Sequence, residues 1–149
     1  IVYGGGGIMP DYFVPLDTTQ YSNYFYNLRA KGLINKAALG QVDNYRKELL
    51  NKYPTVEQFY KSFAVDDKIL NPLKADADSE KIEFKEEEYE RSKPLIIFQI
   101  KALMARDLYD MEAYFKIFNN ESDIFKKAFE VIKDDKVYDA LLRGDKTNI

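Results

Sequence analysis

Few side chains in this sequence could attack a substrate. The 149 residues contain no cysteine and no histidine, so thiolate nucleophiles, Ser-His-Asp triads and zinc sites built on thiolate or imidazole ligands are excluded. A serine hydrolase contained within this chain would need a lysine as its base. None of the serines lies in a Gly-x-Ser-x-Gly elbow, and Ser62 follows Lys61 on a predicted helix, where adjacent residues point in different directions. We therefore predict no catalytic residue among the five serines, which are Ser22, Ser62, Ser79, Ser92 and Ser122.

Four of the seven glycines form one run, from Gly4 to Gly7. A Walker loop would end in Gly-Lys-Ser/Thr, but Ile8, Met9 and Pro10 follow here, and a dinucleotide fingerprint that began at Gly4 would need its third glycine where Met9 stands. The run is therefore predicted to be a turn where backbones approach closely. No cofactor is predicted.

Alternating carboxylates at Asp76, Asp78 and Glu80 suggest a calcium loop. An EF-hand needs a glycine at its sixth position, and that position is Lys81. We predict a solvated acidic face and no metal site. Two further clusters beside lysines are also predicted to be solvated helix faces: Glu86 to Glu88 and Asp134 to Asp135.

Aromatic residues are abundant, with 12 tyrosines and 10 phenylalanines. Tyr21, Tyr24, Phe25 and Tyr26 could stack against a sugar or a peptide. Their helical spacing instead predicts core packing, with tyrosine hydroxyls reaching the rim.

The composition is that of a globular domain, with 46% hydrophobic and 32% charged residues. A net charge of -3 offers no basic field for phosphate backbones, so nucleic acid is not predicted as a partner. No run of about 18 apolar residues occurs, so no membrane span is predicted.

From residue 18 onward the apolar spacing is that of helices. The first predicted helix ends at Gly32, and the second ends before Pro54, with Gly40 inside it indicating a close helix contact. Thr55 and Gln58 form a capping-box signature that starts the third. The predicted apolar faces are Tyr21, Tyr24, Phe25 and Leu28; Ile34, Ala38, Val42, Tyr45 and Leu49; and Val56, Phe59, Tyr60 and Phe63.

The later helices are less regular. Pro72 is predicted to break or kink a weak helix over residues 66–79, and an extended connection and a charged turn precede a strong helix that begins near Pro94. This helix is predicted to be the centre of the bundle. Two shorter helices follow, the second ending at Gly144. The stripes of these three helices are Ile97, Ile100, Met104, Leu108 and Met111; Phe125, Ala128, Phe129 and Ile132; and Val137, Tyr138, Leu141 and Leu142.

The fold class is therefore predicted to be mainly α, an irregular bundle of about six or seven helices preceded by a short Gly-rich β segment. The segment is residues 1–17, where Tyr12-Phe13-Val14 lies between two prolines that confine it to a sheet edge. The helical domain is residues 18–149. The start at Ile1-Val2-Tyr3 is typical of the middle of a strand, which predicts that the chain is cut from a longer one.

Residues 2–14 resemble the end of the catalytic core of carboxyl-terminal processing proteases, also called tail-specific proteases. In that family a glycine-Ile-x-Pro-Asp stretch followed by an apolar strand closes the protease domain. Stretches 90–96 and 99–108 look like the helical extension of members from the envelopes of Gram-negative bacteria. The residues that carry the motif are Gly4, Gly5, Gly6, Gly7, Ile8, Pro10 and Asp11.

The resemblance implies a parent serine endopeptidase with a PDZ-type domain and a Ser/Lys dyad, both upstream of the motif. No residue of this chain inherits a catalytic role, and the motif residues carry over as structure only. The resemblance further implies a periplasmic or cell-envelope location, and protein substrates and the upstream core as partners. The helices would brace the core, contribute to a homo-oligomer or limit substrate access. In the isolated chain, residues 1–17 are predicted to be disordered, to form a hairpin or to pair with another copy.

The alternative function is a free-standing helical module that binds a peptide or a glycan. A cytosolic nucleic-acid-binding or regulatory helical domain is a third interpretation, which the acidic charge disfavours.

Overall fold

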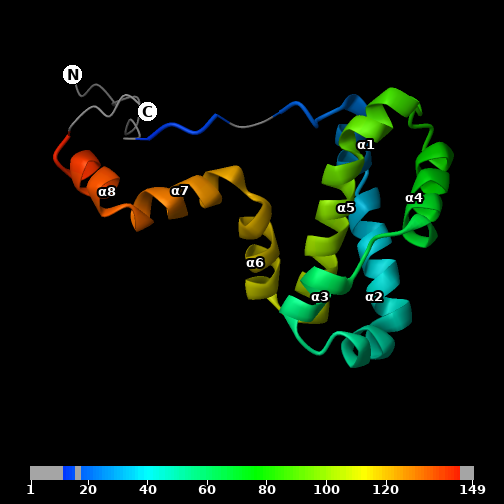
Figure 1. The fold of residues 1–149 in the computed structure, drawn as a ribbon. Helices are drawn as coiled ribbons and strands as arrows, with labels where there is room; N and C mark the ends of the chain where they lie inside the picture. Colours follow the sequence, from blue (N-terminus) through cyan, green and yellow to red (C-terminus); the bar gives the residue numbers. More distant parts are fainter. Residues whose placement is uncertain (1–11, 16–17, 145–149) are drawn as a thin grey trace, which may run out of the picture. The chain divides into compact units, whose positions relative to one another are not determined.

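A computed structural model describes residues 12–15 and 18–144 of the chain. The described residues form eight helices and no strand, so the mainly α class is confirmed, and the predicted helix count is too low (Figure 1). The Gly-rich stretch of the predicted β segment lies outside the described residues, and residues 12–15 form neither helix nor strand. The helices are α1 Asn23–Ala30, α2 Leu33–Lys52, α3 Val56–Ser62, α4 Asp67–Ser79, α5 Glu86–Leu108, α6 Met111–Glu121, α7 Asp123–Lys133 and α8 Asp135–Leu142.

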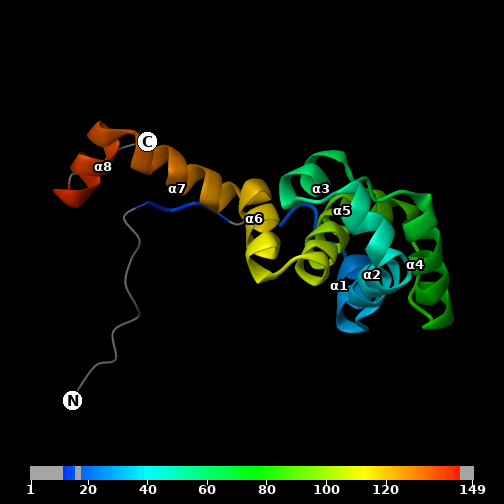
Figure 2. The same cartoon turned by 90° about the horizontal axis from the view of Figure 1, so that it is seen from below.

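The chain divides into two units. Asp17–Phe118 is one, and residues 12–15 group with the described residues from Asn119 onward in the other. In the larger unit α5 contacts α1, α2 and α3, with α2 as its main partner, while α4 packs on α2 (Figures 1 and 2). The predicted central position of α5 in the bundle is confirmed.

The core stripe of α5 agrees with the predicted one in its middle and differs at its two ends. Ile96, Ile100, Met104 and Leu108 are all buried, at a spacing of four residues. Ile100, Met104 and Leu108 were predicted, but Met111 is 54% exposed because α5 ends at Leu108.

Two prolines lie inside helices, where breaks or starts were predicted. The charged turn over residues 86–91 and the apolar helix after it are one helix, α5, with Pro94 in its interior. Likewise α4 runs on through Pro72, so of the predicted break or kink the break does not occur. A proline in a helix costs about 3 kcal/mol. Buried Leu70 and Leu73 on either side of Pro72 supply enough packing to offset that cost.

Local capping signals in the larger unit perform as predicted. Gly32 has a φ of 69° and separates α1 from α2, a left-handed conformation that glycine adopts readily. The Oγ1 of Thr55 accepts a hydrogen bond from the Gln58 N–H at 3.3 Å, which starts α3. By contrast, a Cβ added at Gly40 would meet nothing within 4 Å, so the predicted close helix contact is wrong.

The predicted stripe of α2 is interrupted at Tyr45. Ile34, Ala38 and Val42 are buried, but Tyr45 has non-helical torsion angles (φ -128°, ψ 16°) and is 47% exposed. The kink at Tyr45 interrupts the helical spacing, whereas Leu49, the last predicted position, is partly buried against the core.

Helix α6 was missed by the sequence patterns. Its first turn is capped by Asp110, whose Oδ1 accepts a hydrogen bond from the Ala113 N–H at 2.8 Å. Ala113 and Ile117 are buried one turn apart. Met111 lies in the spacing of the α5 stripe, so the pattern extended α5 across a real boundary.

The smaller unit contains the two predicted short helices. Ser122 caps α7, Asp134 caps α8, and Gly144 (φ 75°) follows the end of α8 as predicted. Neither helix contains a buried residue. No helix in the described part of the chain is both long enough and apolar enough to cross a membrane.

Candidate functional site

Four of the five serine hydroxyls make hydrogen bonds that cap helices or join elements. Ser22 and Ser122 cap α1 and α7, Ser79 donates to the Ala75 carbonyl at 3.0 Å, and Ser92 donates to the Gln20 carbonyl at 2.6 Å. Ser92 is completely buried in the core. These four hydroxyls all bond to backbone groups, as expected of capping and packing residues.

The predicted acidic face forms ion pairs between helices. Lys36 Nζ lies 2.8 Å from Asp76 Oδ1, and Lys31 Nζ lies 3.0 Å from Glu80 Oε2. These contacts join α4 to α2 and to the end of α1. Within the described ranges no group of three or more acidic side chains is arranged to hold a metal ion. The motif residues Gly4 to Ile8, Pro10 and Asp11 lie outside the described residues.

The aromatic set on α1 is mostly core, as predicted. Tyr24 and Phe25 are buried, Tyr21 packs against the core, and Tyr26 is half exposed. Tyr24 also belongs to a second aromatic group with Phe84 and Tyr89. Burial, with a smaller contribution from the Glu90 carboxylate, raises the pKa of Tyr89 to about 12.

A lysine of the chain already occupies that aromatic group. Lys74 Nζ lies 3.8 Å from the centre of the Tyr89 ring, a cation–π contact. A cavity of about 340 Å³ beside it is lined by Tyr24, Lys74 and Phe84. Because Lys74 already covers the face of the Tyr89 ring, that face is not free to bind a cationic ligand.

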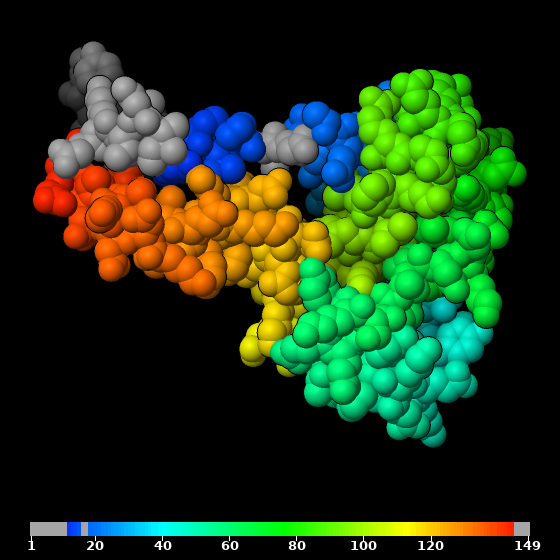
Figure 3. All heavy atoms as spheres, viewed as in Figure 1, coloured from blue at the N-terminus to red at the C-terminus, as the bar shows by residue number. Residues whose placement is uncertain are grey.

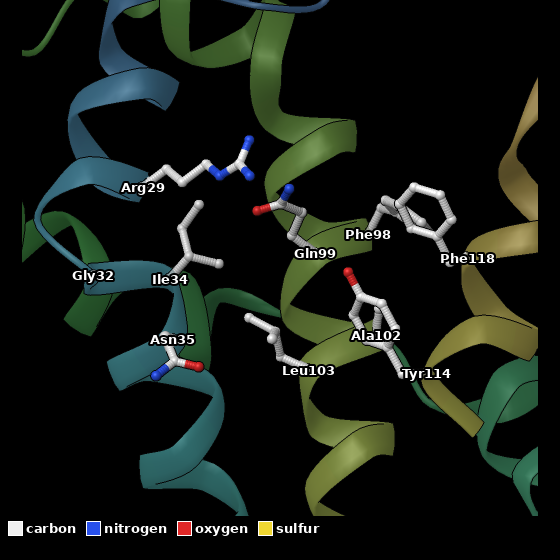
Figure 4. A pocket seen from close by; sticks show the side chains of 10 residues that line it. All are labelled: Arg29, Gly32, Ile34, Asn35, Phe98, Gln99, Ala102, Leu103, Tyr114 and Phe118. Atoms are coloured by element: carbon white, nitrogen blue, oxygen red, sulfur yellow. The ribbon is translucent and has the colours of Figure 1, made fainter. Parts of the chain in front are cut away.

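A pocket with a volume of about 190 Å³ lies between α1, α2, α5 and α6 (Figure 4). Buried Ile34 and Ala102 line it, and Phe98 flanks it. Tyr114 from α6 lines the same pocket.

Polar side chains from three helices meet at this pocket. Arg29 of α1 extends toward Gln99 of α5, and Asn35 of α2 lies below them (Figure 4). In the described part of the chain Arg29 has no carboxylate within ion-pair distance. Asn35 Oδ1 lies 3.5 Å from Arg106 Nη2, and Arg106 Nε is paired with Asp107 Oδ1 at 3.0 Å. A guanidinium beside amides has the donors and acceptors that suit a carboxylate or a peptide backbone.

The sequence patterns did not single out this pocket. Arg29, Asn35 and Gln99 lie on the polar sides of three separate helices, where charged and amide residues are ordinary. Tyr114 lies on α6, which was not predicted. Only the packing of α1 and α2 on α5 brings these side chains together.

Residues 24–110 match the model of a family described as a family of unknown function, DUF8443. The chain belongs to the DUF8443 family. The DUF8443 region begins in α1 and ends at Asp110, between α5 and α6. It therefore covers the core of the larger unit. Arg29, Asn35 and Gln99 lie within it, whereas α6, α7 and α8 follow it. No curated protein and no solved structure matches the chain.

Proposed function

We propose that this DUF8443 chain is the non-catalytic helical C-terminal part of a carboxyl-terminal processing serine endopeptidase of the periplasm or cell envelope. The observation that carries the proposal is the stretch Gly7-Ile8-Met9-Pro10-Asp11, followed by the apolar residues Tyr12 to Val14. A mainly helical body follows this stretch, as the resemblance leads one to expect. The acyl nucleophile and its lysine base would belong to the upstream core.

The helical body is well suited to bracing that core, because its first helix is held firmly. The Ser92 hydroxyl binds the Gln20 carbonyl, and Glu88 Oε2 accepts a hydrogen bond from the Tyr24 N–H at 2.9 Å. Both contacts join the start of α1 to α5. In the sequence, Gln20 follows Val14 by only six residues.

Contacts at the far end of α5 make the body rigid. Lys101 Nζ donates to the carbonyls of Tyr60 and Phe63 at 2.6 and 2.7 Å, which satisfies the end of α3. The Tyr109 hydroxyl donates to the Tyr53 carbonyl, which fixes the connection between α2 and α3. A body of this kind can hold a neighbouring domain in one orientation.

Casein cleavage tests the proposal. Three proteins are compared: the full-length parent, the parent truncated after residue 17, and the 149-residue chain alone. We expect cleavage only from proteins that contain the upstream core, and none from this chain. The parent with its catalytic serine replaced by alanine is the control for a contaminating protease. Cleavage by the chain alone would overturn the proposal.

The second candidate function is a free-standing module that binds a peptide or a glycan. The observation that favours it is the pocket with Arg29 at its edge and Phe98 at its side. If the ligand is a peptide with a free carboxylate, Arg29→Gln should weaken binding about tenfold, because a charge-assisted bond is lost. Arg91→Gln, an exposed change elsewhere on α5, is the matched control. Binding measured by NMR titration with free-acid and amidated peptides, and with oligosaccharides, separates the two ligand classes.

A further inference from the structure

The hairpin of α7 and α8 presents an apolar surface that the described residues cover only in part. Phe129, Ile132 and Leu142 are 51%, 61% and 70% exposed. A groove of about 660 Å³ runs between the two helices, lined by Ile124, Ile132, Tyr138 and Leu142 among others. Contiguous apolar surface of this kind marks an interaction site.

The charge of the hairpin limits what could cover the groove. From Asp123 to Leu142 there are five carboxylates and four lysines. A near-neutral segment has no electrostatic attraction for an anionic lipid surface or for a strongly charged protein. An apolar, uncharged polypeptide surface is the partner with matching chemistry.

A short segment of the chain itself shows what the groove accepts. Residues 12–15 lie along α7 (blue against orange in Figures 2 and 3), with Tyr12 and Val14 lining the groove. Phe13 between them is 76% exposed. This alternation is that of an extended chain with one face on the groove. Lys127 Nζ lies 5.6 Å from the centre of the Tyr12 ring, which adds a cation–π contact.

We infer that the α7–α8 groove is the surface by which the helical tail docks on the upstream protease core. The inference rests on the proposed function, in which Tyr12 to Val14 is the last strand of the core. A neighbouring strand would lie about 4.8 Å from it. With Tyr12 and Val14 seated in the groove, that sheet must lie beside the hairpin. Ile132 and Leu142, still exposed at the groove, are the side chains that the core would cover.

Photo-crosslinking in the full-length parent tests this docking. A benzophenone amino acid replaces Ile132 or Leu142, and the crosslinked peptides are mapped by mass spectrometry. We expect crosslinks within one polypeptide, to residues upstream of Ile1. The same probe at Phe115, which is 52% exposed on α6 and outside the groove, should lose these crosslinks. Crosslinks to a second copy, to lipid, or to nothing would overturn the inference.

A paired substitution gives an independent readout. Ile132→Asp with Leu142→Asp changes two exposed side chains, so the helix content should stay the same by circular dichroism. Cleavage of residues 119–144 by trypsin in the parent should become about tenfold faster, because the undocked hairpin opens more often. Phe115→Asp is the control and should leave the rate unchanged. An unchanged rate in the double variant would contradict docking.

The two proposals fail in different ways. If the parent has no peptidase core and does not cleave casein, the proposed function falls and the docking falls with it. If the parent cleaves casein but the crosslinks join two copies, the docking alone is wrong.

Discussion

Ser92→Ala removes one oxygen from the middle of a buried chain of hydrogen bonds. The Ser92 Oγ lies 2.6 Å from the Gln20 carbonyl oxygen and 2.8 Å from Ser22 Oγ. A carbonyl only accepts and each hydroxyl carries one proton, so Ser92 donates to Gln20 and Ser22 donates to Ser92. The Phe25 N–H completes the chain by donating to Ser22 Oγ at 3.2 Å.

The size of the effect follows from burial. A buried polar group that loses its partner costs about 1–3 kcal/mol. Ser22 is buried and would lose its acceptor, whereas the Gln20 carbonyl, which would lose its donor, belongs to an exposed residue that water can reach. We therefore expect Ser92→Ala to lower the free energy of unfolding by about 2 kcal/mol. For a unit of roughly 100 residues this corresponds to a fall in Tm of about 8–16 °C.

Urea unfolding of the 149-residue chain, followed by circular dichroism, measures this difference at constant m-value. Ser62→Ala makes the same deletion at an exposed position of α3 and should stay within about 0.5 kcal/mol of the unsubstituted chain. The double variant Ser22→Ala with Ser92→Ala should lose less free energy of unfolding than the sum of the two single variants, because both substitutions interrupt the same series of hydrogen bonds. If Ser92→Ala matches Ser62→Ala, or the two costs simply add, the reasoning is refuted.

Three further predictions concern other parts of the larger unit. Gly40→Ala should raise the free energy of unfolding by about 0.5–1 kcal/mol, because the added Cβ has open space in a helix interior. Gly32→Ala should lower the free energy of unfolding by about 1–2 kcal/mol, because alanine is strained in the left-handed conformation of this residue. Equal effects of the two substitutions in urea unfolding would contradict both predictions. The hydrogen bond from Lys116 holds the pKa of the Glu57 carboxyl below its usual value, so in an NMR titration Lys116→Met should return that pKa toward normal. The stability from this pair is present above the usual glutamate pKa and is lost as the pH falls through the lowered one. Tyr89→Phe should remove one phenol that titrates at about 12 in ultraviolet absorbance. The raised pKa of Tyr89 contributes stability that is fully present below the usual tyrosine pKa and is lost as the pH rises through about 12. If all tyrosines titrate at the usual pKa in the absorbance spectrum, the prediction for Tyr89 is wrong.

Local signals predicted the parts of the fold that local energetics decides. The spacing of Tyr24, Phe25 and Leu28 with Gly32 after them predicted α1, because one turn of helix and one left-handed residue are short-range features. Thr55 predicted the start of α3 for the same reason. Asp110 is an equally good cap for α6, but Met111 continued the spacing of the α5 stripe and concealed the boundary.

Tertiary packing decided the rest. Pro72 and Pro94 are strong local breakers, yet both lie inside helices because neighbouring core residues offset the lost hydrogen bond. Arg29 and Gln99 meet only because two helices pack together, which no local pattern encodes. The periodicity of α7 predicted a helix correctly, but it did not predict that none of the residues of α7 would be fully buried by the described part of the chain.

The bond between Ser92 and Gln20 has a mechanical consequence. Tension transmitted along the backbone from residues before Thr18 reaches the Gln20 carbonyl, and through it the interior of α5, before it reaches the first turn of α1. The Glu88 carboxylate holds the Tyr24 N–H within that first turn. A load on the backbone before Gln20 therefore meets two contacts with α5 at the start of α1. The start of α1 is thus anchored to α5 at the point where the chain enters the larger unit.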